Sequence, residues 1–349
     1  MAAILILGAG VMGSAFSFPP ADLGHEVKLV GTPLDREVIR ELKTSRIHPK
    51  LNMKLADGVR FYYHDELEEA LKGRIDLIVL GVSSAGVEWA VQTLGPLLAK
   101  PVPILMLTKG LAVREETLAT LPQVVSDGLF AYGAGRFTVG AVGGPCIAGE
   151  LAARRDTRVT FGWPDSEDFQ WLDSLFKTAY YHINYTTDLT GLEICAAMKN
   201  FYAIAVGYPA GLLEVAETPA NKALMHNLSA GLFEQSVKEM ARLAGWMRGD
   251  LKNVYGLAGV GDLYVTCQAG RNSRMGRYLG TGMTYSEAKR EKMAEDTVEG
   301  AELALTIGPL LLRLFGSEIL SAREYPLASA IIDAICHDAP MRIPWDLFD

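Results

Sequence analysis

A lysine within a small-residue apolar helix is the first candidate for chemistry in this chain. Lys199 and Asn200 end the stretch 191–200, GLEICAAMKN. An amine buried among apolar side chains can transfer a proton near neutral pH, because burial lowers its pKa. A lone lysine in such a helix can instead extend its ammonium group to water, so this stretch alone leaves both interpretations open.

Two later stretches carry further polar groups in unusual settings. Residues 256–267 are GLAGVGDLYVTC, in which three glycines precede Asp262. This pattern indicates a shaped backbone that presents the carboxylate, although a plain loop with an N-capping aspartate has a similar composition. Residues 270–274 are GRNSR, a compact donor-rich turn that suits a phosphate group. A solvated basic loop is the alternative for that turn.

The N-terminal motif GAGVMG, residues 8–13, follows the apolar run Ile4–Leu7 and precedes a helical pattern. A second β-type run follows within about thirty residues, which is the context in which GxGxxG binds a dinucleotide. In that context Gly8 permits the tight turn, Gly10 lets the backbone approach a pyrophosphate, and Gly13 allows the helix to pack closely on the strand. The helix N-terminus offers amide groups to the phosphates. We therefore expect a dinucleotide site rather than a turn without a ligand.

The residues after the second strand leave the choice between NAD and NADP open. An NAD site often has Asp or Glu at this strand end, and an NADP site often has an arginine nearby. Here the strand ends at Val30-Gly31-Thr32, and Asp35 and Arg36 come slightly later. Neither a clear acid nor a committed arginine stands at the strand end itself.

Alternating apolar runs and helical patterns in the first half predict a doubly wound, Rossmann-type α/β sheet of parallel strands. Strands are expected at 4–7, 25–30, 76–82, 102–107 and, as the last one, 179–185. Helices are expected at 14–23, 35–44 and 87–98. Pro19-Pro20 should bend or shorten the first helix.

After about residue 185, long amphipathic segments replace this alternation. They occupy 189–205, 222–243, 285–292, 298–314 and 327–335. Few strand signals interrupt them, so this half should be mostly α-helical. We predict two domains, a dinucleotide-binding domain at 1–185 and a helical substrate-binding and catalytic domain at 186–349.

Composition argues against several classes of protein. The net charge of −8 does not fit a nucleic-acid-binding surface, which needs a basic stripe. Four scattered cysteines without a CxxC pair fit a reducing compartment and offer neither a disulfide framework nor a zinc site. The apolar N-terminus lacks the basic region of a signal peptide, and no uncharged stretch is long enough to cross a membrane. We expect a cytoplasmic protein that needs no metal.

In order and spacing, these motifs resemble the NAD(P)-dependent glycerol-3-phosphate dehydrogenase family over nearly the whole chain. The block GLAGVGDLYVTC followed by GRN is the most specific part of the resemblance. The other matching stretches are GAGVMG at 8–13, HPKL at 48–51, LTKGL at 107–111, GGPCIAGE at 143–150, AAMKN at 196–200 and VEG at 298–300.

The resemblance implies that Lys199 is the general acid/base, that Lys109 is a second active-site lysine, and that Asp262 orients Lys199. It implies substrate-binding roles for Lys109, Cys146, Asn200, Thr266, Arg271 and Asn272. It implies cofactor contacts for Gly8, Gly10, Val11, Met12, Gly13, Lys109, Ala148, Arg271 and Glu299. The expected cofactor is NAD or NADP. The expected partners are a small phosphorylated substrate and a second copy of the chain in a homodimer, with no nucleic acid and no membrane span.

The implied reaction interconverts sn-glycerol 3-phosphate and dihydroxyacetone phosphate by hydride transfer. A base must remove the hydroxyl proton as hydride leaves the carbon, and in reverse an acid must protonate the developing alkoxide. Burial and the charge of Lys109 would lower the pKa of Lys199, whereas Asp262 would raise it. The net pKa of Lys199 therefore stays open.

Three departures from the family pattern leave the exact substrate open. Cys146 stands where a polar side chain is common, residues 232–237 are LFEQSV in place of an Arg-Gly-Leu pattern, and GTPLD follows the second strand where an arginine is common. Another phosphorylated polyol or sugar is therefore an alternative substrate. A non-catalytic NAD(P)-binding sensor is the alternative of another class, and the intact Lys109, Lys199 and Asp262 argue against it.

Overall fold

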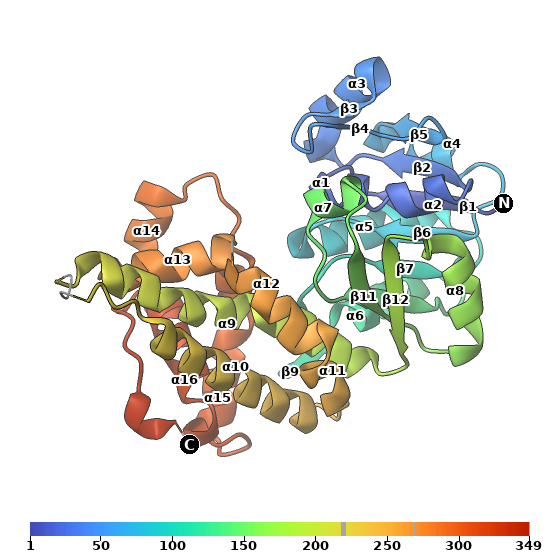
Figure 1. Ribbon diagram of the computed structural model, residues 1–349. Helices are drawn as coiled ribbons and strands as arrows, with labels where there is room; N and C mark the ends of the chain where they lie inside the picture. The colour runs from blue at the N-terminus through green and yellow to red at the C-terminus, as the bar shows by residue number, and fades with distance from the viewer. Residues whose placement is uncertain (218–220, 269, 349) are drawn as a thin grey trace. The chain divides into compact units, whose positions relative to one another are not determined.

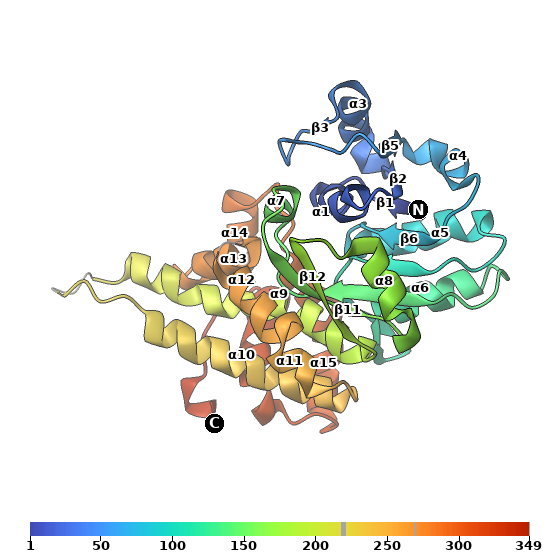
Figure 2. The ribbon, with the colours of Figure 1, turned by 45° about the vertical axis from the view of Figure 1, so that its right-hand side comes forward.

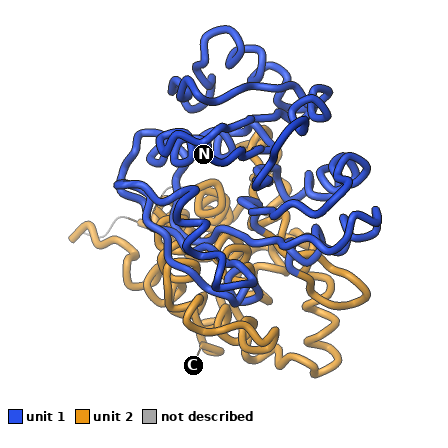
Figure 3. The backbone as a smooth tube through the Cα atoms, turned by 90° about the vertical axis from the view of Figure 1, so that its right-hand side faces the viewer, with its two compact units in different colours: residues 1–109, 120–192 blue, residues 110–119, 193–349 orange. Residues whose placement is uncertain are grey.

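The computed structural model describes residues 1–217, 221–268 and 270–348 (Figure 1, Figure 2). The chain forms two compact units, which Figure 3 colours separately. Unit 1 comprises residues 1–109 and 120–192, and unit 2 comprises residues 110–119 and 193–349. The division falls inside the long helix α9, Leu189–Val215.

Unit 1 is built on a sheet with the strand order β12-β11-β10-β7-β6-β1-β2-β5. Its neighbouring strands pair in parallel except β10 and β11, which are antiparallel. The strands are β1 (Ala3–Leu7), β2 (Glu26–Val30), β5 (Val59–Tyr62), β6 (Leu77–Leu80), β7 (Ile104–Met106), β10 (Val139–Gly143), β11 (Thr157–Gly162) and β12 (Tyr181–Thr186). Every residue of β1 and β6 is buried, as expected for central strands covered on both faces. The predicted Rossmann-type sheet is confirmed.

The helices of unit 1 follow the expected alternation with the strands. They are α1 (Val11–Ala15), α2 (Phe18–Asp22), α3 (Arg36–Ser45), α4 (Leu67–Leu71), α5 (Val87–Leu94), α6 (Leu121–Phe130), α7 (Ala148–Ala152) and α8 (Phe169–Phe176). Short 3₁₀ turns lie at Pro33–Asp35, His64–Glu66, Ser84–Gly86, Gly95–Leu97 and Ser166–Asp168. A small hairpin of β3 (Ile47–His48) and β4 (Met53–Lys54) follows α3.

The first predicted helix differs from the structure in where it begins and in being broken. It begins at Val11 rather than at residue 14, and it is interrupted between α1 and α2. Pro19 and Pro20 have no backbone N–H to continue the helical ladder, so they are accommodated only in the first turns of a new helix. Phe16, at this break, packs against Phe176 of α8 with ring centroids 4.9 Å apart, which fixes α1 and α2 on the core.

Unit 2 is mostly α-helical, as predicted. It contains the remainder of α9 and the helices α10 (His226–Trp246), α11 (Leu251–Tyr255), α12 (Asp262–Gln268), α13 (Arg271–Gly280), α14 (Tyr285–Lys292), α15 (Glu299–Gly316) and α16 (Pro326–Cys336). Short 3₁₀ turns lie at Ala322–Glu324 and Trp345–Leu347. A hairpin of β8 (Leu111–Arg114) and β9 (Thr117–Thr120), absent from the sequence prediction, places β8 against α15.

Helix α9 is long and apolar enough, by length and composition alone, to cross a membrane. However, 83% of its most apolar window is buried inside the structure. Burial of this kind is typical of the core helix of a soluble protein. Among the described residues, α9 is the only helix long and apolar enough to cross a membrane.

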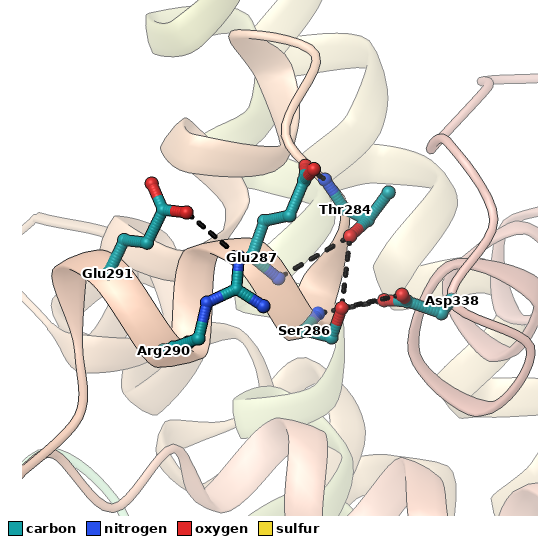
Figure 4. Close-up of polar contacts among 6 residues, drawn as sticks. All are labelled: Thr284, Ser286, Glu287, Arg290, Glu291 and Asp338. Carbon is teal, nitrogen blue, oxygen red and sulfur yellow. Dashed lines mark hydrogen bonds and ion pairs between the residues drawn. The ribbon is translucent and has the colours of Figure 1, made fainter.

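The start of α14 shows how side chains define the ends of these helices (Figure 4). The Thr284 hydroxyl accepts a hydrogen bond from the Glu287 backbone N–H, and the Glu287 carboxylate accepts one from the Thr284 N–H. This reciprocal pair satisfies two amides that a helix leaves unpaired. Asp338 accepts hydrogen bonds from the Ser286 hydroxyl and N–H, which lower the pKa of Asp338 and attach the C-terminal segment to α14.

Candidate active site

A buried ion pair forms the centre of the polar cluster in unit 2. Nζ of Lys199 on α9 lies 2.5 Å from Oδ1 of Asp262 at the start of α12. Lys199 is 7% exposed and Asp262 is 2% exposed. Because water is nearly excluded, each charge is stabilised by the other, and removal of one would leave the second buried without this ion pair. The lysine does not extend to bulk water, so the snorkelling alternative does not hold.

The glycine-rich segment before Asp262 takes an unusual helical form. Residues Leu257–Gly261 form one π-helical turn (η6), and the N–H of Gly261 bonds to the carbonyl of Gly256 at 3.2 Å. Such wide turns are rare and recur at functional sites. The expected shaped backbone is therefore a π-turn that delivers Asp262 into the first turn of α12. Thr266, one turn later, donates its hydroxyl to the Asp262 carbonyl at 2.7 Å.

A second set of contacts lies immediately beside the ion pair. Asn200 donates from Nδ2 to Glu299 at 2.9 Å and accepts from Nδ2 of Asn272 at 3.0 Å. Asn272 in turn accepts from the Gly300 backbone N–H at 2.9 Å. Asn200 and Asn272 are each 6% exposed, so their amide orientations are fixed by these bonds. The network joins the centre of α9 to the N-terminal turns of α13 and α15.

Arg271 is the more accessible member of the cluster. It begins α13, and its guanidinium lies 3.4 Å from Glu299, with both side chains about half exposed. Arg271 also lines a cavity of unit 2 together with Arg274, Arg277 and His226. An exposed pair of this length holds the guanidinium only weakly, so Arg271 can exchange its partner for an anion.

Cys267 lies in the wall of the same cavity and is a poor nucleophile. Burial raises the pKa of its thiol to about 12, against a smaller opposing effect of the Lys199 charge. At neutral pH the thiol is therefore protonated, whereas the thiolate is the reactive form. Among the described residues, no three His, Cys, Asp or Glu side chains gather as potential ligands of a metal ion.

The glycine loop of unit 1 has the shape that a dinucleotide pyrophosphate requires. Gly8 has φ +114°, and a Cβ there would lie 2.7 Å from the Gly81 backbone. A Cβ on Gly13 would overlap the Gly8 carbonyl, whereas space remains open around Gly10. The loop thus packs tightly on its inner side and stays clear at Gly10, so these residues fit the cofactor class that the motif predicts. Val11 and Met12 form the first turn of α1.

The other predicted ligand residues of unit 1 follow strand ends on the same edge of the sheet. Lys109 comes three residues after β7, and Cys146 comes three residues after β10, which pairs with β7 in parallel. Ala148 begins α7. The carboxyl edge of a parallel sheet is where open α/β folds bind ligands. Cys146 is partly buried against the hydrophobic core of the unit.

Two residues without a predicted role also contact the glycine loop. Asp35 accepts a hydrogen bond from the Ala9 N–H, and His48 donates one to the Ala9 carbonyl. His48 belongs to the HPKL stretch, to which the sequence alone assigns no function.

Comparison with known proteins matches both halves of the chain to one family. Residues 3–168 match the model of the NAD-dependent glycerol-3-phosphate dehydrogenase N-terminus, and residues 188–343 match that of the C-terminus. The chain belongs to this family. It is therefore an oxidoreductase that uses NAD or NADP, as predicted.

Individual relatives cover nearly the full length. The NADP(+)-dependent glycerol-3-phosphate dehydrogenase of Archaeoglobus fulgidus is 35% identical over 86% of this chain and 87% of its own. The glycerol-3-phosphate dehydrogenase [NAD(P)+] of Geobacter metallireducens is 30% identical over 97% of this chain and 93% of its own. The crystal structure of glycerol-3-phosphate dehydrogenase from Coxiella burnetii is 25% identical with a TM-score of 0.80, covering 99% of this chain and 97% of that one.

Proposed function

We propose that this chain catalyses the NAD(P)-dependent interconversion of sn-glycerol 3-phosphate and dihydroxyacetone phosphate. The observation that carries the proposal is the buried Lys199–Asp262 pair beside the Asn200–Asn272 network and Arg271. This arrangement supports proton transfer by Lys199 beside groups that can bind a phosphate. The family membership and the activities after which the relatives are named support the same reaction.

Lys199 is the proposed general acid/base. In the reductive direction its ammonium group protonates the alkoxide that forms from the carbonyl, and in the oxidative direction the amine removes the hydroxyl proton. Asp262 holds Nζ at 2.5 Å and so fixes the direction of the transfer. While protonated, Lys199 also stabilises negative charge on the substrate oxygen, and Lys109 is proposed to add a second positive charge.

Arg271, Asn272 and Asn200 are the proposed phosphate-binding residues. The guanidinium supplies a charged, forked donor, and the two amides supply neutral donors at fixed positions. Thr266 and Cys146 are proposed to contact the remainder of the substrate. The residues Gly8, Gly10, Val11, Met12, Gly13, Lys109, Ala148, Arg271 and Glu299 are proposed to contact NAD(P), which supplies the hydride chemistry when bound.

The test is an initial-rate comparison of NADH and NADPH with dihydroxyacetone phosphate, following the absorbance of the reduced nicotinamide. We expect turnover with at least one cofactor, and the ratio of the two kcat/KM values gives the cofactor preference. Absence of turnover with both would refute the proposed reaction.

A different phosphorylated polyol or sugar is the second candidate substrate, because Cys146 replaces a polar residue of the family pattern. The departure at 232–237 does not favour it, since Gln235 and Ser236 are buried in α10 and bond to Glu239 and Leu232 of the same helix. A panel of ketose phosphates separates the candidates. A higher kcat/KM on another ketose phosphate than on dihydroxyacetone phosphate would favour the second.

The proposal includes a cytoplasmic homodimer. Exposed apolar side chains of unit 2 support self-association, among them Val215, Leu224, Tyr255, Tyr264 and Ile319. Light scattering of the purified chain measures the oligomeric state directly, and a monomer at micromolar concentration would contradict this part of the proposal.

A further inference from the structure

Ala9, between the first two glycines of the loop, is held on both sides by residues from outside the motif. Its N–H donates to Oδ2 of Asp35 at 3.1 Å, and its carbonyl accepts from Nε2 of His48 at 3.1 Å. The same Asp35 oxygen accepts from the Thr32 N–H and hydroxyl, each at 2.8 Å. The carbonyl of Ala9 also accepts from the Ser14 hydroxyl at 3.1 Å, within the loop-helix segment itself.

The hydrogen bonds of His48 fix its protonation state. A carbonyl cannot donate, so Nε2 must carry the proton that bonds to Ala9. Nδ1 accepts from the backbone N–H groups of Lys50 and Leu51, at 3.2 and 3.1 Å. The imidazole is therefore neutral, with one nitrogen facing the glycine loop and the other forming the turn of its own HPKL segment. His48 is fully buried.

We propose that Asp35 and His48 are positioning residues that fix the Ala9 peptides, and with them the glycine loop, in the form that receives the cofactor's pyrophosphate. Glycines flank Ala9 on both sides, so the adjoining peptides have little intrinsic preference for one orientation. Two external contacts remove that freedom before the ligand arrives, which lowers the entropy lost on binding. Through His48, the HPKL stretch thus contributes to the affinity for the cofactor. The inference rests on the assignment of NAD(P) as cofactor, but not on the substrate.

Protonation of His48 should weaken this arrangement. Nδ1 now accepts hydrogen bonds from two backbone N–H groups. A proton on Nδ1 would point at those two donors, so the HPKL turn would have to rearrange. Burial lowers the pKa of His48, as does the Lys50 charge, while the Ala9 carbonyl and Asp35 oppose this effect. Because the buried imidazole binds its proton less tightly than a free one, the neutral arrangement persists below about pH 6.5 and weakens only as the pH falls through the lowered pKa of His48 in the folded chain.

Two substitutions separate positioning of the loop from general support of the fold. In His48→Gln the amide nitrogen can replace Nε2 and keep the bond to Ala9. In His48→Asn the shorter side chain can replace the Nδ1 acceptor for Lys50 and Leu51, but it cannot reach Ala9. His182→Asn, in β12 at the opposite edge of the sheet, is the matched control.

The readout is the dissociation constant of ADP-ribose, measured by calorimetry on the full chain, together with the thermal midpoint. ADP-ribose contains the pyrophosphate but not the 2′-phosphate, whose own titration near pH 6 would obscure the pH series. We expect His48→Asn to weaken binding roughly three- to tenfold, the factor of one net hydrogen bond, and His48→Gln and His182→Asn to stay near wild type. Wild-type affinity should stay constant down to about pH 6.5 and decrease only at lower pH, and this decrease should be absent in His48→Asn.

Equal affinities for the wild type and His48→Asn would overturn the proposal. So would equal losses in His48→Asn and His48→Gln that follow their thermal midpoints, because that pattern belongs to a structural residue. If the wild-type chain does not bind ADP-ribose at all, the cofactor assignment fails instead.

Discussion

At the scale of single residues, the decisive feature is that Lys199 and Asp262 are both buried and in contact. Neither charge is solvated by bulk water. The free-energy cost of removing both charges from water is offset only by their mutual contact and by further polar neighbours. A pair of this kind contributes little to stability compared with an apolar pair, so function is the better explanation of its presence. The sequence alone could not decide between a buried and a solvated lysine, because helical periodicity does not report which neighbours reach a side chain.

Lys199→Met should reduce kcat by roughly 10²–10⁴-fold, since it removes the acid/base group while keeping a similar side-chain volume. Binding of NAD(P)H should change little. The variant leaves Asp262 buried without its partner, so the thermal midpoint should fall, and the double variant with Asp262→Asn should recover part of that loss. Steady-state kinetics and calorimetry check these expectations. Lys238→Met, which alters a lysine on α10 that pairs with Glu234, is the control. Wild-type turnover in Lys199→Met would show that the proton comes from elsewhere.

Arg271→Ala should mainly raise KM for dihydroxyacetone phosphate, by roughly ten- to a hundredfold, because it removes a charged donor to phosphate. Unphosphorylated dihydroxyacetone should be used equally poorly by both proteins. Arg290→Ala on the surface of α14 removes a guanidinium that is even more exposed, 66% against 47% for Arg271, and should leave KM unchanged. An equal loss on both substrates would contradict the phosphate role of Arg271.

At the scale of elements, the site depends on an unusually close approach of α9 and α13. A Cβ on Gly276 of α13 would overlap the carbonyl of Ile204 on α9. Without a side chain at this crossing, the two helices come close enough for Asn200 on α9 to bond Asn272 on α13. A long-range contact of this type is not visible in a helical pattern, which reports only the apolar face of each helix.

Gly276→Ala should therefore separate α13 from α9. Overpacking at such a crossing costs about 1–3 kcal/mol, so the thermal midpoint should fall, and kcat/KM should fall with it as Asn272 and Arg271 move. On α10, a Cβ at Gly231 would make only an ordinary contact with Trp345 at 3.5 Å. Gly231→Ala should thus be neutral or stabilising, as usual for Gly to Ala in a helix. If both variants behave alike, close packing does not position the site.

Local patterns predicted five of the eight strands of the unit 1 sheet and the long helices of unit 2, but not β5, β10 and β11. Continuous apolar runs identified β1, β6 and β7, and amphipathic spacing identified the helical half. What escaped prediction depends on partners far along the chain. The hairpin β8–β9 is short and, apart from Thr120, belongs to unit 2, and His48 acquires its role only through Ala9, 39 residues earlier. The sequence predicts the π-turn before Asp262 only as an irregular backbone, because glycines permit many backbone conformations without specifying one of them.

At the scale of the whole molecule, a buried carboxylate joins three helices of unit 2. Glu239 on α10 accepts hydrogen bonds from the backbone N–H groups of Leu327 and Ala328 at the start of α16, at 2.7 and 2.8 Å. It also accepts from Gln235 on its own helix and from the hydroxyl of Tyr202 on α9. Burial nevertheless dominates and raises the pKa of Glu239 to about 7. Unfolding would return this group to an ordinary pKa near 4.5.

The sign of the resulting pH dependence follows from this difference. Between about pH 4.5 and 7 the folded chain keeps a proton that the unfolded chain has lost, so the contribution of Glu239 to stability decreases as the pH rises. The loss totals roughly 3 kcal/mol at 1.36 kcal/mol per pKa unit. Glu239→Gln cannot titrate, so its thermal midpoint should fall less than that of the wild type from pH 5 to pH 7.5. Glu234→Gln, at an exposed position of the same helix, should keep the wild-type slope. A wild-type slope in Glu239→Gln would mean that the carboxylate stays ionised in the fold, satisfied by its four donors, and that burial does not control its titration.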